Sequence, residues 1–455
     1  MSNTRDQKRL YIEHLGCAKN QVDAEVMLNV LAGEGYTSVE DASDADLILV
    51  NTCGFIESAR KESIDTFFAL KNAYPEAKII LTGCLSQRYA KELSDELIEA
   101  DAIFGNRDLQ EIAQVVREVN RGKRVVLTPS YPHITDEVDQ RSHLFNYPGS
   151  AYLKISEGCN HRCRYCAIPL IRGSLRSRPM DNILSEAATL ITQGVKEINL
   201  IAQDLAAYGT DFGDNTSRFM ELLKKMVALE GEFFIRLLYI HPDDFPPQLI
   251  DFVKENPKVL PYFDIPFQHA HKDVLRSMGR KGDSETYLSL IRSIRSRIPE
   301  ATIRSTVMVG FTHESDETIA SLISFLQEGE IDWVGSFVYS LEEGTPAYKD
   351  RTKKEYNSVM KKASKWQKMV EEVQQHITTT RLQSIVGTVQ QVLIEELVDQ
   401  EDLAIGRTAQ QAPEVDGLTV IRGKNFIPGS LVECVITQVN GIDFEAEAVD
   451  KGTYR

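Results

Sequence analysis

Two kinds of hydrophobic pattern alternate along the first 127 residues. Short continuous apolar runs lie at residues 9–15, 47–52 and 78–83, and between them apolar residues recur at helical spacing. Continuous apolar runs of this length are typical of buried strands, and their alternation with helices predicts βαβ units. The pattern therefore predicts an α/β domain with a parallel sheet over residues 1–128.

A cysteine follows each of these three apolar runs. Cys17 comes after the first run and one glycine, and Cys53 and Cys84 come directly after the second and third. In a doubly wound sheet the carboxyl ends of the strands share one edge, where ligands bind, so we expect the three thiols to converge. The alternative is three unrelated buried cysteines, which are common in protein cores.

The alternation of apolar runs and helical patterns resumes after residue 150. Residues 129–149 contain three prolines and several polar residues, and we expect a linker there. Six further candidate strands lie at residues 151–156, 197–203, 233–240, 260–267, 302–310 and 333–340. Helical patterns separate them, for example at 180–193 and 284–297, and a long charged helix is expected over 353–382. Six βα units without doubling back predict an incomplete (β/α)6 barrel over 150–382, with its chemistry at the carboxyl ends of the strands.

The pattern changes again in the last part of the chain. Short alternating runs between residues 387 and 449 are separated by Gly, Pro and Asn turns. This pattern predicts a small antiparallel β barrel, within a C-terminal module at 383–455. Residues 387–449 have a formal charge of −8, half of the −16 of the whole chain. An acidic module disfavours a nucleic-acid partner and favours a basic one.

Composition indicates the class of protein and where in the cell it is expected. The chain has 455 residues, of which 42% are hydrophobic, as in an ordinary globular protein of about three domains. The N-terminus lacks the apolar core of a signal peptide, and no apolar run approaches the roughly 18 residues of a membrane span, so we expect a cytoplasmic protein without membrane contact. The cytosol keeps thiols reduced, so the seven cysteines favour metal binding or catalysis over disulfides.

The strongest local motif is a CxxxCxxC sequence directly after the first predicted barrel strand. Its cysteines are Cys159, Cys163 and Cys166. Three thiolates at this spacing hold three irons of a cubane cluster and leave the fourth iron open to a ligand. The alternative is a zinc site, for which His161 is the only nearby fourth ligand, although it lies between two of the cysteines.

This motif resembles that of the radical S-adenosylmethionine superfamily, in which an aromatic residue precedes the last cysteine, as Tyr165 does here. The resemblance implies that S-adenosylmethionine chelates the open iron. It also implies that one electron from the cluster cleaves the cofactor to methionine and a 5'-deoxyadenosyl radical. We expect Tyr165 and the strand-end Gln203 to contact the cofactor, with packing alone as the alternative for both.

The whole chain is similar to the methylthiotransferase branch of that superfamily, which combines a three-cysteine domain, a radical barrel and a β module of the TRAM type. The resemblance implies that Cys17, Cys53 and Cys84 hold an auxiliary 4Fe-4S cluster, making two 4Fe-4S clusters in all. In this branch one S-adenosylmethionine methylates a cluster-bound sulfur, and another provides the radical that activates a carbon. An electron donor and a sulfur donor are also needed, and the sequence identifies neither.

Within this branch the sequence resembles the RimO group more than the MiaB group, which modifies tRNA. The similar stretches are residues 17–20, 54–56, 168–178, 264–269, 333–335, 339–345 and 412–417. The resemblance implies that the substrate is the β-carbon of one aspartate in small-subunit ribosomal protein twelve. Two alternatives remain: an adenosine of tRNA as substrate, or a non-catalytic iron–sulfur sensor or scaffold.

A few residues depart from the family pattern or match no motif. Residues 309–315 stand where the family reads closer to GFPGET, and Gln410 and Gln411 stand where an acidic residue is more usual. Cys434 matches no motif, and we expect it in the core of the β module. Three arginines follow the cluster loop, and they either steer a substrate or form ion pairs at the barrel rim: Arg172, Arg176 and Arg178.

Overall fold

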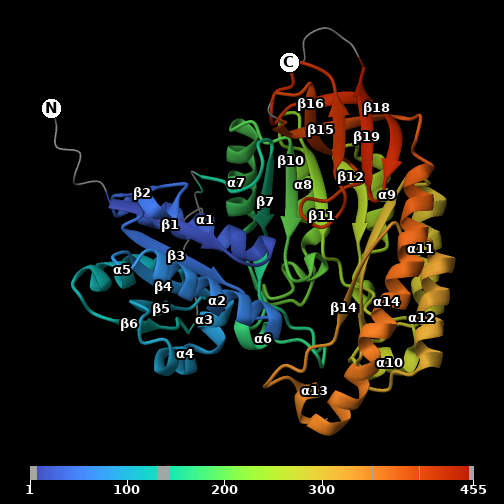
Figure 1. Ribbon diagram of the computed structural model, residues 1–455. Helices are drawn as coiled ribbons and strands as arrows, with labels where there is room; N and C mark the ends of the chain where they lie inside the picture. The colour runs from blue at the N-terminus through green and yellow to red at the C-terminus, as the bar shows by residue number, and fades with distance from the viewer. Residues whose placement is uncertain (1–7, 131–140, 142, 351, 399, 450–455) are drawn as a thin grey trace.

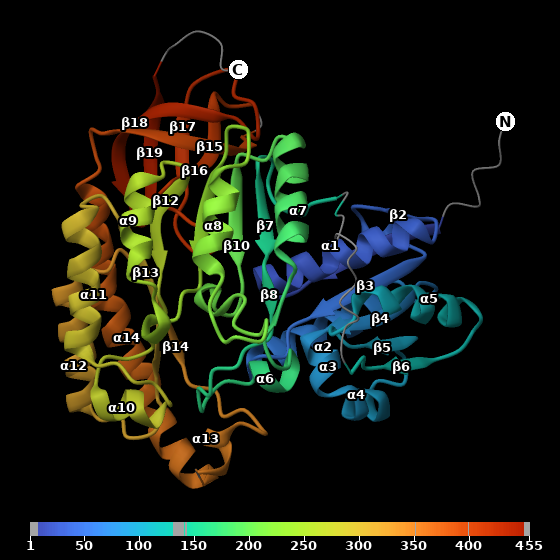
Figure 2. The same ribbon diagram turned by 180° about the vertical axis from the view of Figure 1, so that it is seen from behind.

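The computed structural model describes residues 8–130, 141, 143–350, 352–398 and 400–449, and it shows three units (Figure 1). An N-terminal α/β unit lies beside a central open barrel, and a small β barrel sits across one end of the central unit (Figures 1 and 2). The predicted linker at 129–149 falls partly on residues 131–140 and 142, which are outside the described residues.

The N-terminal unit is a parallel six-stranded sheet in the order β2-β1-β3-β4-β5-β6. The three predicted strands are confirmed as β1 (Lys8–His14), β3 (Leu47–Thr52) and β4 (Lys78–Gly83). Three further strands have only three residues each, too few to show a periodic pattern: β2 (Tyr36–Ser38), β5 (Ala102–Phe104) and β6 (Val125–Leu127). The helices are α1 (Ala18–Gly33), α2 (Glu57–Ala73), α3 (Cys84–Arg88), α4 (Ala90–Glu96) and α5 (Ile112–Asn120). Every residue of β3 is buried, as its continuous apolar pattern predicts.

The central unit is an open parallel sheet of six strands, in the order β14-β13-β12-β11-β10-β7, which confirms the incomplete barrel. Its strands are β7 (Ser150–Lys154), β10 (Glu197–Ile201), β11 (Phe234–Leu238), β12 (Val259–Asp264), β13 (Thr302–Val309) and β14 (Trp333–Val338). Most of its helices cover the outer face of the sheet (Figure 2). They are α6 (Ile168–Ile171), α7 (Met180–Thr192), α8 (Phe219–Val227), α9 (Gln248–Glu255), α10 (Lys272–Ser277), α11 (Ser284–Arg297), α12 (Asp316–Gly329), α13 (Pro346–Lys349) and α14 (Lys353–Gln383).

The C-terminal unit is a closed five-stranded barrel, as predicted. Its strands are β15 (Val389–Leu397), β16 (Leu403–Thr408), β17 (Thr419–Arg422), β18 (Leu431–Asn440) and β19 (Asp443–Ala448). All neighbouring pairs are antiparallel except β17 and β19, which run parallel. Cys434 is fully buried in the core of this barrel, where we expect a cysteine without a motif.

Buried ion pairs join the three units. Glu197 at the start of β10 pairs with Arg236 of β11 at 2.7 Å and with Arg407 of the β barrel at 2.6 Å. On the opposite side of the central unit, Glu342 pairs with Arg88 of the N-terminal unit at 2.7 Å. A buried ion pair is costly to break, because the remaining charge is left without a partner. These contacts therefore fix the orientation of the units relative to one another.

The β barrel carries less surface charge than its formal charge of −8 suggests. Glu395 is 7% exposed and its carboxylate accepts a hydrogen bond from Arg407 at 2.6 Å. The Asp416 side chain is 1% exposed and lies 3.4 Å from Arg304 of β13. Both acids are buried in ion pairs, one within the barrel and one with the central unit, so a charge count alone overstates the acidic surface. No helix among the described residues is long and apolar enough to cross a membrane.

Candidate active site

The structure places Cys17, Cys53 and Cys84 at the same edge of the N-terminal sheet. Cys17 precedes the first residue of α1, Cys53 follows β3, and Cys84 begins α3 directly after β4. Glycines next to the cysteines allow the three cysteine-bearing segments to approach one another closely. A Cβ on Gly16 would lie 3.4 Å from the Cβ of Cys53, and one on Gly54 would lie 2.7 Å from the backbone of Leu85. Side chains at these positions would force the three thiols apart.

Polar groups surround the sulfur of Cys84. Asn106 Nδ2 and Arg172 Nη2 each donate to this sulfur at 3.4 Å, and the thiol lies 3.2 Å from Asn20 Oδ1. Burial raises the pKa of the Cys84 thiol to about 12, and the positive charge of Arg172 opposes that rise. Donors of this kind stabilise a thiolate that binds iron and tune the potential of the cluster.

The CxxxCxxC loop is held on two sides by backbone contacts. Gly158, with φ of +75°, lies so close to the carbonyl of Ser174 that a Cβ would be 2.1 Å from that oxygen. On the other side, the Arg164 N–H donates to the carbonyl of Met278 at 2.9 Å. Gly279 follows directly, and a Cβ there would lie 2.8 Å from the carbonyl of Arg162. Two segments distant in sequence therefore fix the conformation of the loop.

The sulfurs of this loop accept hydrogen bonds from backbone N–H groups. His161 donates to Cys159 at 3.4 Å, and Ile168 donates to Cys166 at 3.5 Å. Burial raises the pKa of Cys159 to about 11 and that of Cys166 to about 12. The free thiols are thus held neutral, and a metal that binds here would have to displace their protons.

The described cysteines do not form a compact set of ligands for a single zinc ion. Zinc binds sulfur at about 2.3 Å, which keeps all ligand atoms of one ion close together. Among the described residues, no three cysteine sulfurs lie within 4.8 Å of one another; only His161, His241 and Asp244 bring three candidate ligand atoms that close. The His161 ring bonds Asp204 at 2.8 Å and stacks on His241 with centroids 4.1 Å apart. The arrangement of the described side chains therefore does not favour the zinc alternative at the CxxxCxxC loop.

Of the two residues expected to contact the cofactor, Tyr165 lies within the CxxxCxxC loop and Gln203 bonds to Glu157 just before it. Tyr165 accepts a hydrogen bond from Arg280 at 3.1 Å and meets the ring of Phe311 edge-on. Gln203 donates to Glu157 at 3.1 Å, and its own carbonyl oxygen is buried without a hydrogen-bond partner among the described residues. Their cofactor contacts stay a prediction. Sequence reasoning missed Arg280, because it reaches Tyr165 from a segment 115 residues away.

Arg172 connects the two sets of cysteines. Its side chain is 2% exposed, and its guanidinium lies 3.0 Å from Asp23 and 2.8 Å from Glu157. The same group contacts Cys84 of the N-terminal unit. Arg178 pairs with Glu186 at 2.7 Å, and Arg176 donates to the Ser174 carbonyl at 3.0 Å. For Arg172 and Arg178 the structure favours structural ion pairs over steering of a substrate.

A loop of the β barrel enters the open side of the central unit, beside β11 (Figure 1). Trp333 donates to the backbone carbonyl of Gln410 at 2.8 Å, and Tyr262 donates to Asp416 at 2.6 Å. Burial raises the pKa of Asp416 to about 6. Gln410 is held here through its backbone. The side chain of Gln411 is buried, and its Oε1 accepts a hydrogen bond from the Thr419 hydroxyl at 2.7 Å. Glutamine at these two positions is therefore compatible with the loop.

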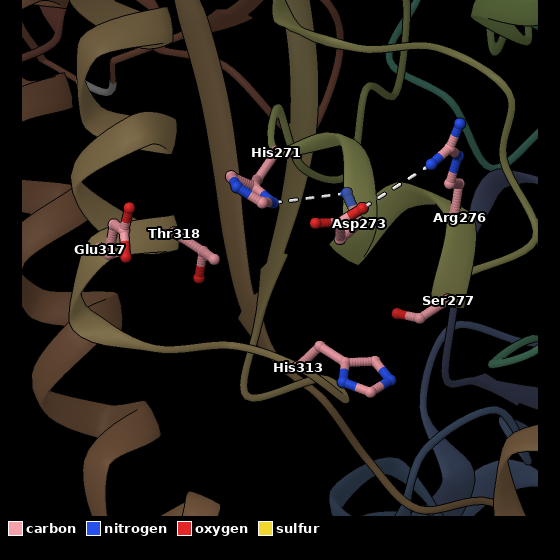
Figure 3. Close-up of a pocket in the computed structure, with 7 residues that line it drawn as sticks. All are labelled: His271, Asp273, Arg276, Ser277, His313, Glu317 and Thr318. Atoms are coloured by element: carbon pink, nitrogen blue, oxygen red, sulfur yellow. Dashed lines mark hydrogen bonds and ion pairs between the residues drawn. The ribbon is translucent and has the colours of Figure 1, made fainter.

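A pocket of the central unit lies outside the cysteine sites (Figure 3). Side chains of α10 and of the loop before α12 line it, including His271, Asp273, Arg276 and His313. No cysteine lines this pocket, so we do not assign the chemistry to it. His313 has φ of +68°, in the left-handed region. It occupies the position of the second glycine in the GFPGET pattern, which explains why glycine is usual there.

Three family profiles match successive parts of the chain. Residues 9–105 match the family described as uncharacterized protein family UPF0004, residues 153–326 match the radical SAM superfamily, and residues 386–449 match the TRAM domain. The solved structure of the radical S-adenosylmethionine methyltransferase TsrM from Kitasatospora setae is similar in fold. Its TM-score is 0.56 at 14% identity, with 75% of this chain and 77% of that chain covered. Together with the cysteine loop, these matches define a radical S-adenosylmethionine enzyme, which uses an iron–sulfur cluster and S-adenosylmethionine.

Whole-chain relatives narrow the class to a family. The ribosomal protein uS12 methylthiotransferase RimO of Treponema denticola is 41% identical over 95% of this chain and 99% of its own. The protein of the same name from Carboxydothermus hydrogenoformans is 38% identical over 97% of this chain and 100% of its own. The chain belongs to the RimO family of radical S-adenosylmethionine methylthiotransferases.

Proposed function

We propose that this protein adds a methylthio group to the β-carbon of one aspartate in ribosomal protein uS12. The observation that carries the proposal is similarity along the whole chain to proteins named for this activity, at 38–41% identity. That similarity spans the cysteine unit, the radical barrel and the β module together. The proposal includes a cytoplasmic reaction, since the substrate is a ribosomal protein.

We infer that the chain holds two 4Fe-4S clusters. Cys159, Cys163 and Cys166 would hold the cluster that binds S-adenosylmethionine, with Tyr165 and Gln203 contacting that cofactor. The auxiliary cluster would be held by Cys17, Cys53 and Cys84. Each set lies at the end of a different sheet and has its own N–H donors to sulfur, which supports two separate sites.

When bound, these groups supply a 5'-deoxyadenosyl radical and a methylated sulfur. The protein's own residues hold the two sites rigidly and keep water away from them. Glu157 does the first: it accepts from Arg172, Lys154 and Gln203 and so ties the cluster loop to the sheet edge. The units meet at this edge through buried charges, which fixes the distance between the two sets of cysteines.

The proposal is tested with purified protein, dithionite as reductant and two candidate substrates. A uS12 peptide that carries the target aspartate should gain the mass of a methylthio group, and unmodified tRNA should not. A Cys159→Ala variant is the matched control and should give no product. In cells that lack the gene, uS12 should lose the modification while tRNA keeps its own.

The other outcomes identify the alternatives. Methylthiolation of tRNA with unmodified uS12 would reject the substrate and retain the radical chemistry. A protein that holds iron but cannot cleave S-adenosylmethionine when reduced would be a sensor or scaffold. The electron donor in the cell and the source of sulfur are separate questions, which dithionite and added sulfide bypass in this assay.

A further inference from the structure

A lysine of the N-terminal unit reaches the carboxyl edge of the central barrel. Lys19 lies in the first turn of α1, two residues after Cys17. Its ammonium nitrogen lies 3.3 Å from the ring centroid of Tyr239, the residue that follows β11. Lys19 is 8% exposed, so its charged end lies between the two units rather than in solvent. A cation over an aromatic face is stabilised electrostatically, but the ring accepts no conventional hydrogen bond.

This ammonium has no carboxylate partner in the described part of the chain. No described carboxylate oxygen lies within 4.0 Å of it, although Cys17, Asp264 and Glu157 are near enough to act on its charge. Both of those acids already have partners: Asp264 lies 3.2 Å from Arg304, and Glu157 lies 2.8 Å from Arg172. A buried ammonium is costly unless anions lie near it, so a ligand carboxylate in direct contact would stabilise Lys19 beyond what the more distant charges of Cys17, Asp264 and Glu157 do.

We propose that Lys19 binds the side-chain carboxylate of the aspartate that is modified. The proposal rests on the function proposed above and names the residue that selects its substrate. In aspartate the reacting β-carbon is bonded directly to the carboxylate carbon. A carboxylate held by Lys19 would therefore place the β-carbon between two sites. On one side is Cys17 of the N-terminal unit, and on the other are the carboxyl ends of the strands of the central barrel. Asparagine, which is neutral, leaves the ammonium unpaired, so the same contact provides selectivity.

Peptide binding tests the proposal without any turnover. The probes are a uS12 peptide with its target aspartate and the same peptide with asparagine there. Wild-type protein should bind the aspartate peptide about 10 to 100 times more tightly, as expected for a buried charge-assisted contact. Lys19→Met should bind both peptides equally, at the wild-type affinity for the asparagine peptide. Lys19→Arg keeps the charge and should keep part of the selectivity.

Lys8→Met is the matched control. Lys8 also lies over a tyrosine ring, that of Tyr36 at 5.2 Å, but it is exposed at the far end of the same sheet. This variant should keep the wild-type selectivity. Lys19→Met should also keep the iron content of the wild type and its reductive cleavage of S-adenosylmethionine. Weaker S-adenosylmethionine binding in Lys19→Met would mean that Lys19 holds the cofactor carboxylate, and would overturn the proposal.

A second measurement uses the wild-type protein and avoids a folding defect in the variant. Reductive methylation of Lys19, followed by mass spectrometry, should be slowed by the aspartate peptide and not by the asparagine peptide. Equal selectivity in Lys19→Met and wild type, or no protection of Lys19, would overturn the role of Lys19 alone. The proposed function would then still stand if the wild type methylthiolates the peptide. If the wild type neither binds nor modifies it, both proposals fall.

Discussion

The guanidinium of Arg172 lies 3.4 Å from the sulfur of Cys84, although the two residues belong to different units. The arginine follows the CxxxCxxC loop, and the cysteine begins α3 directly after strand β4 of the N-terminal sheet. One buried side chain thus joins Cys84 of the N-terminal unit to Glu157, two residues before the first cysteine of the CxxxCxxC loop. The position of this loop relative to Cys84 therefore depends on Arg172.

Replacing Arg172 by Met should destabilise the junction between the two units. The carboxylates of Asp23 and Glu157 would lose their guanidinium partner in a buried place, which typically costs about 3–5 kcal/mol. Lys154 still pairs with both acids, so we expect the lower end of that range. The thermal-unfolding midpoint of the cluster-loaded protein should fall by several degrees, and iron should be lost from it faster on dialysis.

Arg162→Met is the control, because Arg162 lies on the same loop but is exposed. It should leave the unfolding midpoint and the rate of iron loss close to those of the wild type. If Arg172→Met behaves like the control, the ion pairs of Arg172 with Asp23 and Glu157 do not stabilise the junction.

Removing one set of cysteines at a time should show which set is needed for cleavage of S-adenosylmethionine and which for product formation. With Cys159, Cys163 and Cys166 replaced by Ala, about half of the iron should remain, because each set is expected to bind one cluster of the same size. The variant with Ala at Cys17, Cys53 and Cys84 should also keep about half of the iron. It should still cleave S-adenosylmethionine when reduced, but it should make no methylthio product.

Iron analysis, 5'-deoxyadenosine release and peptide mass together distinguish the possibilities. Complete loss of iron from either triple variant, or no loss, would contradict two independent sites. Product from the variant that lacks the N-terminal cysteines would contradict an auxiliary cluster. Cys434→Ala is a control, since this thiol is buried in the β barrel core and should not affect iron.

The sequence pattern predicted the location of the thiols better than their surroundings. Each of Cys17, Cys53 and Cys84 follows a strand, and strand ends in a parallel sheet share an edge, so local periodicity was enough. Arg172 and Lys19 were different. Their partners lie in other units, and no local pattern encodes a contact across an interface.

Charge was the property that the sequence predicted least well. Formal charge counts Glu395 and Asp416 as surface acids. Both are buried, and they form ion pairs with Arg407 and Arg304. The shortest strands were also missed, because three residues, as in β2 and β5, cannot show a period. The failure for charge has a non-local cause, because the burial of an acid is decided by segments that are distant in the sequence.

His269 should make the protein less stable in mild acid. The ring is fully buried, and burial lowers the pKa of His269 to about 3, while in the unfolded chain it titrates near 6.5. The folded state keeps the ring neutral, so its contribution to stability is complete above about pH 6.5 and is lost as the pH falls towards about 3. By pH 5 the loss from this group should be about 2 kcal/mol.

A His269→Asn variant isolates that contribution. Nδ1 of His269 accepts the His271 N–H at 2.9 Å, and an asparagine oxygen can accept the same bond without titrating. Unfolding midpoints of both proteins between pH 5 and pH 7.5 should show a smaller acid-induced decrease in the variant. Parallel curves would mean that His269 is protonated in the folded protein as readily as in the unfolded chain.

The last prediction concerns the acidic surface of the β barrel and its encounter with uS12. Ribosomal proteins are generally basic, so exposed acids should speed the encounter more than they strengthen the final complex. Glu396, Glu401 and Asp402 are exposed on this barrel, and replacing them by Gln or Asn should lower the association rate with uS12 at low salt. The difference from wild type should shrink as salt is added, because exposed charges are screened over about 10 Å at 0.1 M. Glu395→Gln is the contrasting variant: its carboxylate is buried against Arg407, so it should lower stability and leave the salt dependence unchanged. A salt-independent effect of the surface variant would mean that these residues act through direct contacts rather than through the field of the module.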